Sequence, residues 1–303
     1  MSLESVRLKT FRVVAEQLSF THAAERLFLT QPAVTLQIKA LEEELGVRLF
    51  DRTGQQIALT AAGQLLRKYA VRLADVCAEA EQAISALRGE IGGRLTLGAS
   101  TTIAQYLLPR LAGEFLGENP DVELSMITSN TAGVVSALLE NRVALGLIEG
   151  PSARADLKTE PFLEDEIVLV APPSHEWVDA GTPISPHELA QVPLLMREHG
   201  SGTRQIVEDA LAKAKVPTKK LRIAMELDST EAIKSAVAAG LGVGFVSRWA
   251  LAGAQTFLRV IPIQGLRIHR YFQFVYPQGP EPGGASGAFL RFARGRCAET
   301  RPR

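Results

Sequence analysis

The segment from Ser19 to Thr60 constrains the fold more than any other part of this chain. It contains two short helical patterns joined by a tight turn, and a compact stretch rich in turn-forming residues follows. This arrangement predicts a helix-turn-helix with a wing, whose second helix enters the major groove of DNA. A helical hairpin in an ordinary α-helical domain gives a similar pattern, so the pattern alone leaves both interpretations open.

The second helix of this motif is predicted over residues 30–45. Thr30 is a suitable N-cap, and Pro32 lies in the first turn, where its missing N–H costs nothing. Gly46 follows the last turn as a C-cap signal. One face carries apolar residues at helical spacing, and these are Val34, Ile38, Leu41 and Leu45. The opposite face is short and small at its leading end, which suits a helix that enters the major groove.

That opposite face supplies the candidate DNA-reading side chains. Gln31 and Thr35 can hydrogen-bond base edges, whereas Lys39 suits a phosphate. The first helix of the motif is predicted over residues 21–27, where small alanines allow a close crossing with the second. We predict DNA contacts from Thr21, Gln31, Pro32, Thr35, Leu36, Lys39 and, in the wing, Arg52.

Composition limits the partners and the compartment. Lys and Arg together number 33, as do Asp and Glu, so any positive footprint for DNA must come from placement rather than net charge. Cys77 and Cys297 lie far apart and form no metal-binding spacing, which argues against a disulfide scaffold. The chain shows no signal-peptide pattern and no apolar run of membrane-spanning length. We therefore expect a soluble cytoplasmic protein with no membrane partner.

Residues 60–87 predict one long helix, because this stretch contains no proline and only one glycine. Its apolar residues alternate spacings of four and three, which is a heptad pattern. They are Ala62, Leu66, Tyr69, Leu73, Val76, Ala80, Ala83 and Leu87. A narrow stripe of this kind favours pairing with a second copy of the chain, which would match two operator half-sites. Packing against the chain's own domain is the alternative. The sequence GEIGGR at residues 89–94 indicates a hinge.

From Arg94 onward, predicted strands alternate with predicted helices, which indicates an α/β fold with a mostly parallel sheet, large enough for two lobes. Strands are predicted at residues 94–100, 122–129, 143–150, 166–172, 193–198, 221–227 and 243–247. Helices are predicted at residues 103–115, 132–141, 203–215 and 230–239, and a last helix follows a glycine-rich loop near the end.

Hydroxyl and amide side chains gather where these strands pass into helices. Ligands of open α/β sheets bind at this edge, and helix N-termini there favour anions. Each junction alone is equally an ordinary helix cap. The guanidiniums of Arg197 and Arg204 can clamp a carboxylate or phosphate, with structural ion pairs as the alternative. The predicted effector-binding residues are Ser100, Thr101, Thr102, Asn130, Thr131, Arg197, Ser201, Gly202, Thr203, Arg204 and Thr230.

Two sets of motifs resemble one known family. The sequence SFTHAAERLFLTQPAVTLQIKALEEELGVRLFDR, followed by LTAAG, resembles the N-terminal module of LysR-type transcriptional regulators. The sequences GASTTIAQYLLP, LIEG, REHGSGTR and STEAIKSAVAAGLGVGFVS resemble the effector domain of the same family, especially its Calvin-cycle and cysteine-biosynthesis regulators. Leu36 stands where many members carry a basic residue, and His199 stands where that subgroup usually has proline.

This resemblance implies the fold class and the domain organisation. The fold is α/β, with an α-rich N-terminal winged helix-turn-helix, a long linker helix, and a two-lobed periplasmic-binding-protein-like (type II) effector domain. The implied domains are residues 1–60 for DNA binding, 61–91 for the linker, dimerisation helix and hinge, and 92–303 for effector binding. Lobe one would combine residues 92–163 and 268–303, and lobe two residues 164–267.

No catalytic constellation emerges from the sequence. The histidines lie at no metal-ligand spacing, and a G-x-S-x-G nucleophile motif is absent. We predict a ligand-responsive transcriptional regulator rather than an enzyme, with no cofactor and no metal. It would bind double-stranded promoter DNA as a dimer or, as the resemblance implies, a tetramer, sense a small anionic metabolite, and act with RNA polymerase. The alternative is a two-lobed small-molecule-binding protein or enzyme whose helical N-terminal extension serves only dimerisation.

Overall fold

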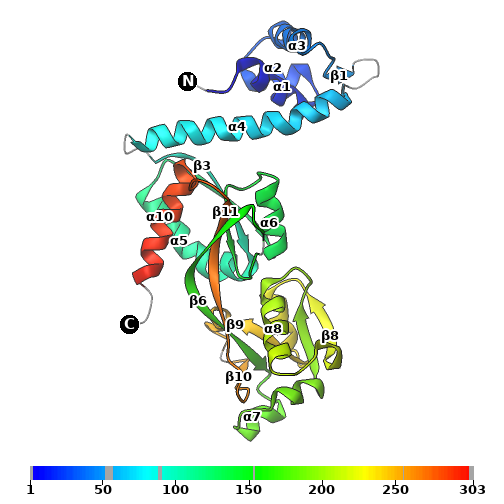
Figure 1. The fold of residues 1–303 in the computed structure, drawn as a ribbon, viewed down its shortest axis with the longest axis vertical. Helices are drawn as coiled ribbons and strands as arrows, with labels where there is room; N and C mark the ends of the chain where they lie inside the picture. The colour runs from blue at the N-terminus through cyan, green and yellow to red at the C-terminus, as the bar shows by residue number, and fades with distance from the viewer. Residues whose placement is uncertain (1–2, 52–56, 88–90, 153, 255, 300–303) are drawn as a thin grey trace. The chain divides into compact units, whose positions relative to one another are not determined.

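The computed structural model describes residues 3–51, 57–87, 91–152, 154–254 and 256–299. The side chains of residues 79, 82, 83, 85–87, 298 and 299 lie outside this description. The chain divides into two compact units, Met1–Glu90 and Ile91–Arg303. Each unit is described by itself, and Figure 1 labels their elements. No helix in the described residues is both long and apolar enough to cross a membrane.

The first unit begins with the helices α1 (Val6–Gln17), α2 (Phe20–Leu27) and α3 (Gln31–Leu45). Thr30 caps α3 as predicted, because its hydroxyl accepts a hydrogen bond from the Ala33 N–H at 3.4 Å. Val34, Ile38 and Leu41 are buried in the core of this unit. The prediction that Leu45 belongs to the same buried face was wrong. Leu45 is 46% exposed, because it is the last helical residue before Gly46 turns the chain at φ +67°.

A two-stranded ribbon follows α3, and its first strand is locked to the helices. Strand β1 (Phe50–Asp51) pairs antiparallel with β2 (Ala58–Leu59). The Phe50 ring lies 5.5 Å from Phe11 and 5.7 Å from Phe20, measured between centroids. Because β1 is fixed in this way, the predicted wing starts from the helical core. Arg52, its predicted DNA contact, lies outside the described residues.

Helix α4 (Ala61–Leu87) is the long helix that the sequence predicts. Thr60 starts it, because its hydroxyl accepts a hydrogen bond from the Gly63 N–H at 3.0 Å. Ala62 and Leu66 pack against the core of the first unit, and Ala70 is fully buried. The first part of the predicted heptad pattern therefore serves the chain's own core.

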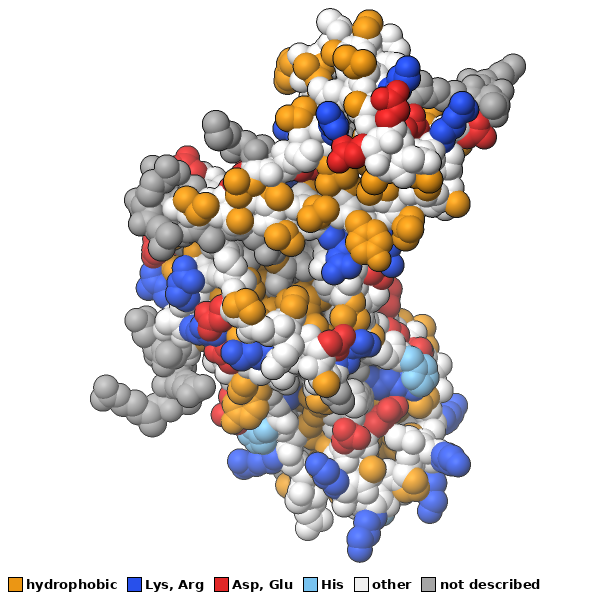
Figure 2. Space-filling model, turned by 45° about the horizontal axis from the view of Figure 1, so that its top comes forward, with side chains coloured by type: hydrophobic (Ala, Val, Ile, Leu, Met, Phe, Trp, Pro, Cys, Tyr) orange, Lys and Arg blue, Asp and Glu red, His pale blue; other side chains and the backbone are white. Residues whose placement is uncertain are grey.

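Farther along α4 the pattern faces outward. Tyr69, Leu73 and Val76 are 50%, 50% and 59% exposed, and we call these three residues the α4 stripe. Figure 2 shows hydrophobic side chains gathered along this helix. The side chains of Ala83 and Leu87, at the end of the predicted pattern, lie outside the described residues. An apolar stripe of this kind on an exposed helix is typical of a helix that packs against a partner.

A single mixed sheet runs through the described part of the second unit. It has nine strands in the order β4-β3-β5-β11-β6-β9-β7-β8, with β10 paired to β6 outside this path. The strands are β3 (Gly93–Ser100), β4 (Val122–Ser129), β5 (Leu145–Ile148), β6 (Leu157–Ala171), β7 (Pro193–Arg197), β8 (Arg222–Leu227), β9 (Val243–Ser247), β10 (Arg259–Ile261) and β11 (Ile268–Pro277). Pairs around β3 and β7 are parallel, as predicted. The prediction of a mostly parallel sheet was wrong for its centre, where β6 and β11 pair antiparallel with each other and with their neighbours.

Strands β6 and β11 are the part of the sheet that sequence patterns missed. Only residues 166–172 were predicted as a strand, whereas β6 begins at Leu157. Pro161 interrupts the first half of β6, and the register against β11 shifts beside it, between Phe272 and Gln273. A proline inside a run normally argues against a strand, and here an irregularity in the ladder accommodates it.

The helices of the second unit include the predicted ones, with shifted bounds, and a short helix, α7, that was not predicted. They are α5 (Leu108–Glu118), α6 (Thr131–Leu139), α7 (Glu176–Ala180), α8 (Gly202–Lys213), α9 (Thr230–Ala238) and α10 (Gly284–Glu299), with short 3₁₀ turns at Pro186–Ala190, Thr218–Lys220 and Arg248–Leu251. A π-helical turn, Ile103–Leu107, precedes α5. Pro109 lies in the first turn of α5, where its ring is tolerated.

Four hydrophobic clusters of the described residues lie along the sheet, and two of them are the larger cores. The first of these cores includes Leu95, Phe115 and Phe289, and the second includes Leu194 and Val207. We call the parts built around these cores lobe one and lobe two. Strand β6 supplies Phe162 and Leu163 to the first core and Ile167 and Leu169 to the second, and β11 also supplies both. These two strands therefore connect the lobes, as Figure 1 shows.

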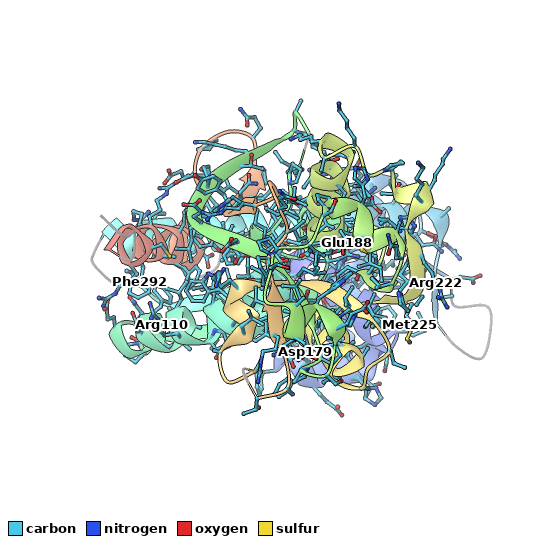
Figure 3. The ribbon with its side chains drawn as sticks, turned by 90° about the horizontal axis from the view of Figure 1, so that it is seen from below. Arg110, Asp179, Glu188, Arg222, Met225 and Phe292 are labelled. Carbon is cyan, nitrogen blue, oxygen red and sulfur yellow. The ribbon has the colours of Figure 1, made fainter. Side chains whose placement is uncertain are left out.

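The outer parts of the lobes differ in how well they are covered. In lobe one, α10 packs on α5, where the rings of Phe292 and Phe115 lie 5.4 Å apart. In lobe two, β8 ends the sheet, and Arg222 and Met225 on this strand are exposed. Figure 3 labels Phe292, Arg222 and Met225 at these places.

Candidate functional site

The predicted strand-to-helix junctions meet between the lobes. The hydroxyls of Thr102, from lobe one, and Thr230, from lobe two, lie 3.2 Å apart. The Asn130 side chain also caps α6 and donates its Nδ2 to Glu198 Oε1 of lobe two at 3.0 Å. Residues far apart in the sequence are thus brought to one place.

Two glycines let the lobes approach backbone to backbone at this place. A Cβ atom added to Gly150 would lie 2.5 Å from the Cα of Gly202, and one added to Gly202 would lie 2.5 Å from the Gly150 nitrogen. The same added atom at Gly202 would lie 2.7 Å from the Thr131 hydroxyl. Larger side chains at these positions would therefore push the lobes apart. This explains why the predicted site residue at position 202 is a glycine, Gly202.

Arg197 and Arg204 are both paired with glutamates. Arg197 is 3% exposed, and its Nε and Nη2 donate to the two carboxylate oxygens of Glu198 at 2.8 and 3.0 Å. Arg204 is 7% exposed and donates to Glu208 at 2.8 Å, to Glu226, and to the Arg197 carbonyl at 2.8 Å. Both guanidiniums therefore make the structural ion pairs that the sequence left open as an alternative.

A buried charged cluster that sequence reasoning missed lies beside these junctions. Arg270 on β11 donates its Nη1 to Glu149 at 2.8 Å and its Nε to Asp165 at 2.7 Å. The three side chains are 1%, 2% and 0% exposed, in the order Arg270, Glu149, Asp165. The Ser247 hydroxyl donates to the other oxygen of Asp165 at 2.8 Å. Two carboxylates thus share one guanidinium inside the protein.

Glu149 connects the two lobes through its carboxylate. One oxygen accepts the Thr102 N–H at 2.7 Å, and the other accepts the Thr203 hydroxyl at 3.0 Å. Burial acts to raise the pKa of Glu149, but the Arg270 charge and the hydrogen bonds together lower it below its ordinary value. Burial dominates at Asp165 and raises the pKa of that carboxyl. The two carboxyls therefore respond to acid in opposite ways.

Four buried polar atoms beside the cluster have no hydrogen-bond partner within the described part of the chain. They are Ser100 Oγ, Thr101 Oγ1, Thr131 Oγ1 and Arg270 Nη2. Buried polar groups are normally satisfied, because leaving one unpaired costs roughly 1–3 kcal/mol. The interlobe region therefore offers donors and acceptors that a small polar ligand could use. We call Thr101, Thr102, Thr131, Thr203 and Arg270, with Glu149, the interlobe site.

Some sequence signal for the missed residues existed. Glu149 lies at the end of a predicted strand, as the predicted hydroxyl residues do. The expectation that residues at strand ends gather at one edge of the sheet therefore applied to Glu149 as well. Arg270 gave less signal, because it lies in a strand, IHRYFQFVYP, that was not predicted. Its partners are Glu149 just after β5, Asp165 on β6 and Thr203 on α8, and only the fold brings them together.

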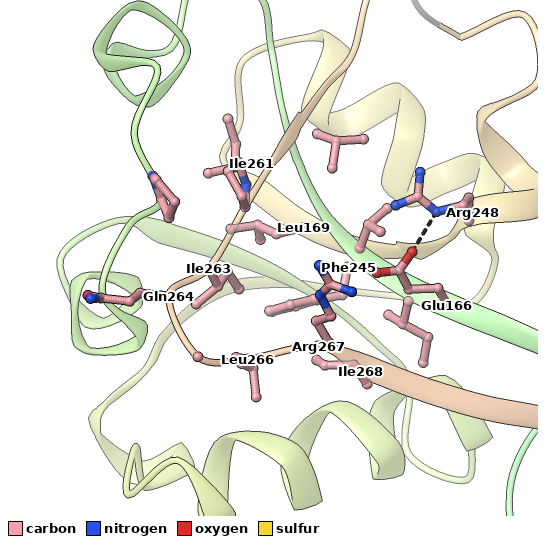
Figure 4. Close-up of a pocket in the computed structure, with 16 residues that line it drawn as sticks. Glu166, Leu169, Phe245, Arg248, Ile261, Ile263, Gln264, Leu266, Arg267 and Ile268 are labelled. Carbon is pink, nitrogen blue, oxygen red and sulfur yellow. Dashed lines mark hydrogen bonds and ion pairs between the residues drawn. The ribbon is translucent and has the colours of Figure 1, made fainter.

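A separate cavity of about 810 Å³ lies in lobe two, and Figure 4 shows it. Leu169, Phe245 and Ile268 line it with apolar atoms. Arg248 pairs with Glu166 at its edge, 2.6 Å apart. None of the predicted effector-binding residues lines this cavity, so the hollow and the predicted chemistry occupy different places.

Most of the predicted DNA-reading residues in the described part of the first unit are exposed. Gln31, Pro32, Leu36 and Lys39 are exposed, as is Thr21 on α2. Gln31 Nε2 donates to the Thr35 hydroxyl at 3.1 Å, and that hydroxyl donates to the Gln31 carbonyl at 3.0 Å. The amide and hydroxyl that were predicted to meet bases are thus held side by side at the start of α3.

The turn between α2 and α3 carries an exposed aromatic residue that the sequence reasoning did not single out. Phe28 is 96% exposed and adopts φ +54° as the C-cap of α2. Its position directly before the recognition helix makes it a further candidate contact. An apolar residue at the turn of a predicted helix-turn-helix was the available signal.

Family models match both units of the chain. Residues 6–64 match the bacterial regulatory helix-turn-helix protein model of the lysR family, and residues 88–298 match the LysR substrate-binding domain. A helix-turn-helix unit joined to a two-lobed α/β ligand-binding unit defines a class of DNA-binding transcriptional regulators. The chain belongs to the LysR family of bacterial transcriptional regulators.

Individual relatives show which regulators of the family this chain resembles. The "Probable RuBisCO transcriptional regulator" of Synechocystis sp. is 35% identical over 290 residues, 94% of this chain and 84% of the relative. The RuBisCO operon transcriptional regulator of Allochromatium vinosum is 33% identical over 294 residues, 96% of each chain. The CcmR regulatory domain of Synechocystis, solved in complex with 2-PG, superposes with a TM-score of 0.63 at 30% identity, covering 69% of this chain and 99% of that one. The predictions of a LysR-type regulator similar to the Calvin-cycle subgroup, and of a regulator rather than an enzyme, are confirmed.

Proposed function

We propose that this regulator binds promoter DNA through α3 and senses a small anionic metabolite at the interlobe site. The observation that carries the sensing half is the set of unpartnered buried atoms, Ser100 Oγ, Thr101 Oγ1, Thr131 Oγ1 and Arg270 Nη2. Three hydroxyls and one guanidinium nitrogen are suited to the oxygens of a carboxylate or phosphate. The 2-PG complex of the CcmR regulatory domain supports a ligand of this kind.

Within this proposal the arginines have different roles. Arg270 presents an unpaired nitrogen and would meet the anion directly. Arg197 and Arg204 each hold glutamates, so they would shape the loop between β7 and α8. That loop carries Ser201, and Thr203 follows in the first turn of α8. The hydroxyls of Ser100, Thr102 and Thr230 and the amide of Asn130 would complete the predicted set.

On the DNA side, we propose that Gln31, Thr35 and Pro32 meet base edges in the major groove. Lys39 and Thr21 would meet the phosphate backbone, and Leu36 a thymine methyl group. Arg52 would add a contact from the wing. The exposure of Gln31, Pro32, Leu36 and Lys39 on α3 supports this arrangement.

We further propose that the domains are residues 1–60, 61–91 and 92–303, and that the chain self-associates through the α4 stripe. A dimer would place two recognition helices on two half-sites, and pairing of dimers would give a tetramer. RNA polymerase would meet this assembly at the promoter. The exposure of Tyr69, Leu73 and Val76 supports the stripe as the contact.

Self-association is tested with Leu73→Glu, which places a charge in the stripe. Interface hot spots contribute about 2 kcal/mol or more, so the dimer dissociation constant should rise about thirtyfold in sedimentation equilibrium. Lys68→Glu, another exposed charge change on α4, serves as the control. Equal effects of the two changes would remove the stripe from the interface.

The function as a whole is tested by two measurements on the full chain. A mobility shift with the DNA upstream of its own gene should show a specific complex that survives competitor DNA. A thermal-shift panel of phosphorylated sugars, dicarboxylates and sulfur-assimilation intermediates should reveal one saturable ligand. At ~100 times its dissociation constant, a ligand stabilises the folded state by roughly 2.7 kcal/mol.

The control for the panel is Thr131→Val, which removes one of the unpartnered hydroxyls while keeping the size of the side chain. It should weaken the response to the active anion and leave DNA binding intact. A response that Thr131→Val does not alter would move the ligand out of the interlobe site. If the chain gives no specific complex in the mobility-shift assay, the proposed function as a DNA-binding regulator is contradicted.

A further inference from the structure

The carboxylate of Glu149 is held as a bound carboxylate ligand would be held. One oxygen accepts the Thr102 N–H of lobe one at 2.7 Å. The other accepts the Thr203 hydroxyl of lobe two at 3.0 Å and the Arg270 Nη1 of the connecting strand β11 at 2.8 Å. The planar group is thus gripped at both oxygens by donors from three separate parts of the fold, in the manner of ligand recognition.

The surroundings of this carboxylate differ from those of an ordinary structural ion pair. Glu149 is 2% exposed, so its contacts are made in a medium of low dielectric, where each is strong. Arg270 already has a second carboxylate partner in Asp165. The cluster therefore holds two carboxylates and one guanidinium. The Arg270 Nη2 atom still lacks a partner within the described residues.

The position of Glu149 ties this grip to the arrangement of the lobes. It immediately precedes Gly150, whose backbone lies against Gly202 at the start of α8. Thr203 follows Gly202 in the same first turn. Any movement that separates Gly150 from Gly202 would therefore pull the Glu149 carboxylate away from the Thr203 hydroxyl.

We propose that the Thr102 N–H, the Thr203 hydroxyl and the Arg270 guanidinium form a carboxylate-binding cradle, and that Glu149 is its internal occupant. The ligand class that competes for this cradle is a small molecule with a planar carboxylate. When such a ligand takes the cradle, Glu149 leaves it, and the interlobe contact that Glu149 made is replaced by contacts to the ligand. This inference rests on the proposed sensing role of the interlobe site, and it names the group against which an effector must compete.

Chemical rescue of a truncated side chain tests the cradle. In full-length Glu149→Ala the cradle loses its occupant, and acetate supplies a free carboxylate of the same shape. Acetate should raise the thermal unfolding midpoint of Glu149→Ala saturably, beyond an equal concentration of chloride. It should leave the wild-type midpoint unchanged, because Glu149 already fills the cradle.

The matched control is Glu160→Ala, which removes another ion-paired glutamate of the same unit. Glu160 pairs with Arg294 and is 30% exposed at its side chain, so water can replace it without a defined cradle. Acetate should not rescue this variant. Rescue of both variants would overturn the cradle, as would a folded Glu149→Ala protein that acetate does not stabilise. Rescue of Glu149→Ala by inorganic phosphate but not by acetate would overturn the carboxylate class.

A variant that fails to fold is also informative. If Glu149→Ala folds only in acetate, the cradle is supported directly. If it folds in neither salt, Glu149→Gln keeps the size of the side chain and weakens only the charged contacts. Hydrogen exchange of the Thr102 amide should then be faster in Glu149→Gln than in the wild type. Unchanged exchange would overturn the proposal.

These outcomes separate this inference from the proposed function. Acetate rescue without any metabolite response in the wild type would retain the cradle and reject its use in sensing. A metabolite response without acetate rescue would retain sensing and reject the cradle.

Discussion

The recognition helix and the interlobe site use side chains in opposite states. Gln31, Pro32 and Leu36 are exposed, and the described hydrogen bonds of Gln31 stay within its own helix. Glu149 and Arg270 are almost completely buried and bonded to distant parts of the chain. An exposed surface suits a large, hydrated polymer, whereas a buried cluster can hold a small molecule with few contacts, each strengthened by low dielectric.

Two ion pairs make the same contrast in energetic terms. Lys39 and Glu43 lie 3.8 Å apart on α3, with side chains 70% and 68% exposed. Arg270 and Glu149 lie 2.8 Å apart, with side chains 1% and 2% exposed. The first pair is screened by water and leaves Lys39 available to another partner, whereas breaking the second would leave a charge uncompensated inside the protein.

The largest expected effect is that of Arg270→Met. The change leaves Glu149 and Asp165 buried without their shared counter-charge, so the free energy of unfolding should fall by about 3–5 kcal/mol. Urea denaturation measures this loss. Arg154→Met, which removes an exposed pair with Asp156, is the control and should change stability little. Equal losses in the two variants would break the contrast between buried and exposed pairs.

The next effect concerns the exposed region. Gln31→Ala should lower affinity for the operator by about 1–3 kcal/mol while leaving affinity for random DNA unchanged, because a base contact is lost. Lys39→Ala should weaken binding to both DNAs and reduce the salt slope by about one. Fluorescence anisotropy at several salt concentrations measures both. If Gln31→Ala weakened binding to random DNA as much, Gln31 would be a backbone contact.

The smallest effect is a difference in acid sensitivity between two neighbouring carboxyls. The pKa of Glu149 is lowered, so the folded state binds fewer protons there, and stability falls as pH drops through that pKa. The pKa of Asp165 is raised, so the folded state binds more protons there, and stability rises as pH drops toward the ordinary aspartate value of about 3.9. Glu149→Gln should therefore flatten the loss of stability in acid, and Asp165→Asn should steepen it.

Urea midpoints measured from about pH 6 to pH 3 test this pair of changes. The wild type and Glu149→Gln should differ least at the acid end, where the Glu149 carboxyl of the wild type becomes protonated and its charged contacts are lost. Parallel curves for the two variants would show that the carboxyls do not respond in opposite directions, and would weaken the account of Glu149 as the strongly held member of the cluster.

Much of the fold followed from local pattern. The cap at Thr30, the first-turn proline Pro32 and the C-cap Gly46 bound α3 correctly, because capping depends on a few adjacent residues. The first half of β6 was not predicted, because a proline such as Pro161 normally argues against a strand. This part of the strand is recognised only from its pairing with β11, which includes a register shift beside Pro161. Leu45 was misplaced, because periodicity cannot tell where along a helix the core ends.

By itself, the sequence determined the helix-turn-helix, the long helix α4, and the junctions from which the interlobe residues project. It also marked candidate DNA contacts on α3, because residues that follow one another along a single helix lie near one another in space. Only the tertiary structure decided that Arg197 and Arg204 pair with glutamates, and that Glu149, Thr203 and Arg270 share one buried cluster. The physical reason is sequence separation, since Arg270 lies 121 residues from Glu149 and only the packing of two lobes around β6 and β11 brings them into contact.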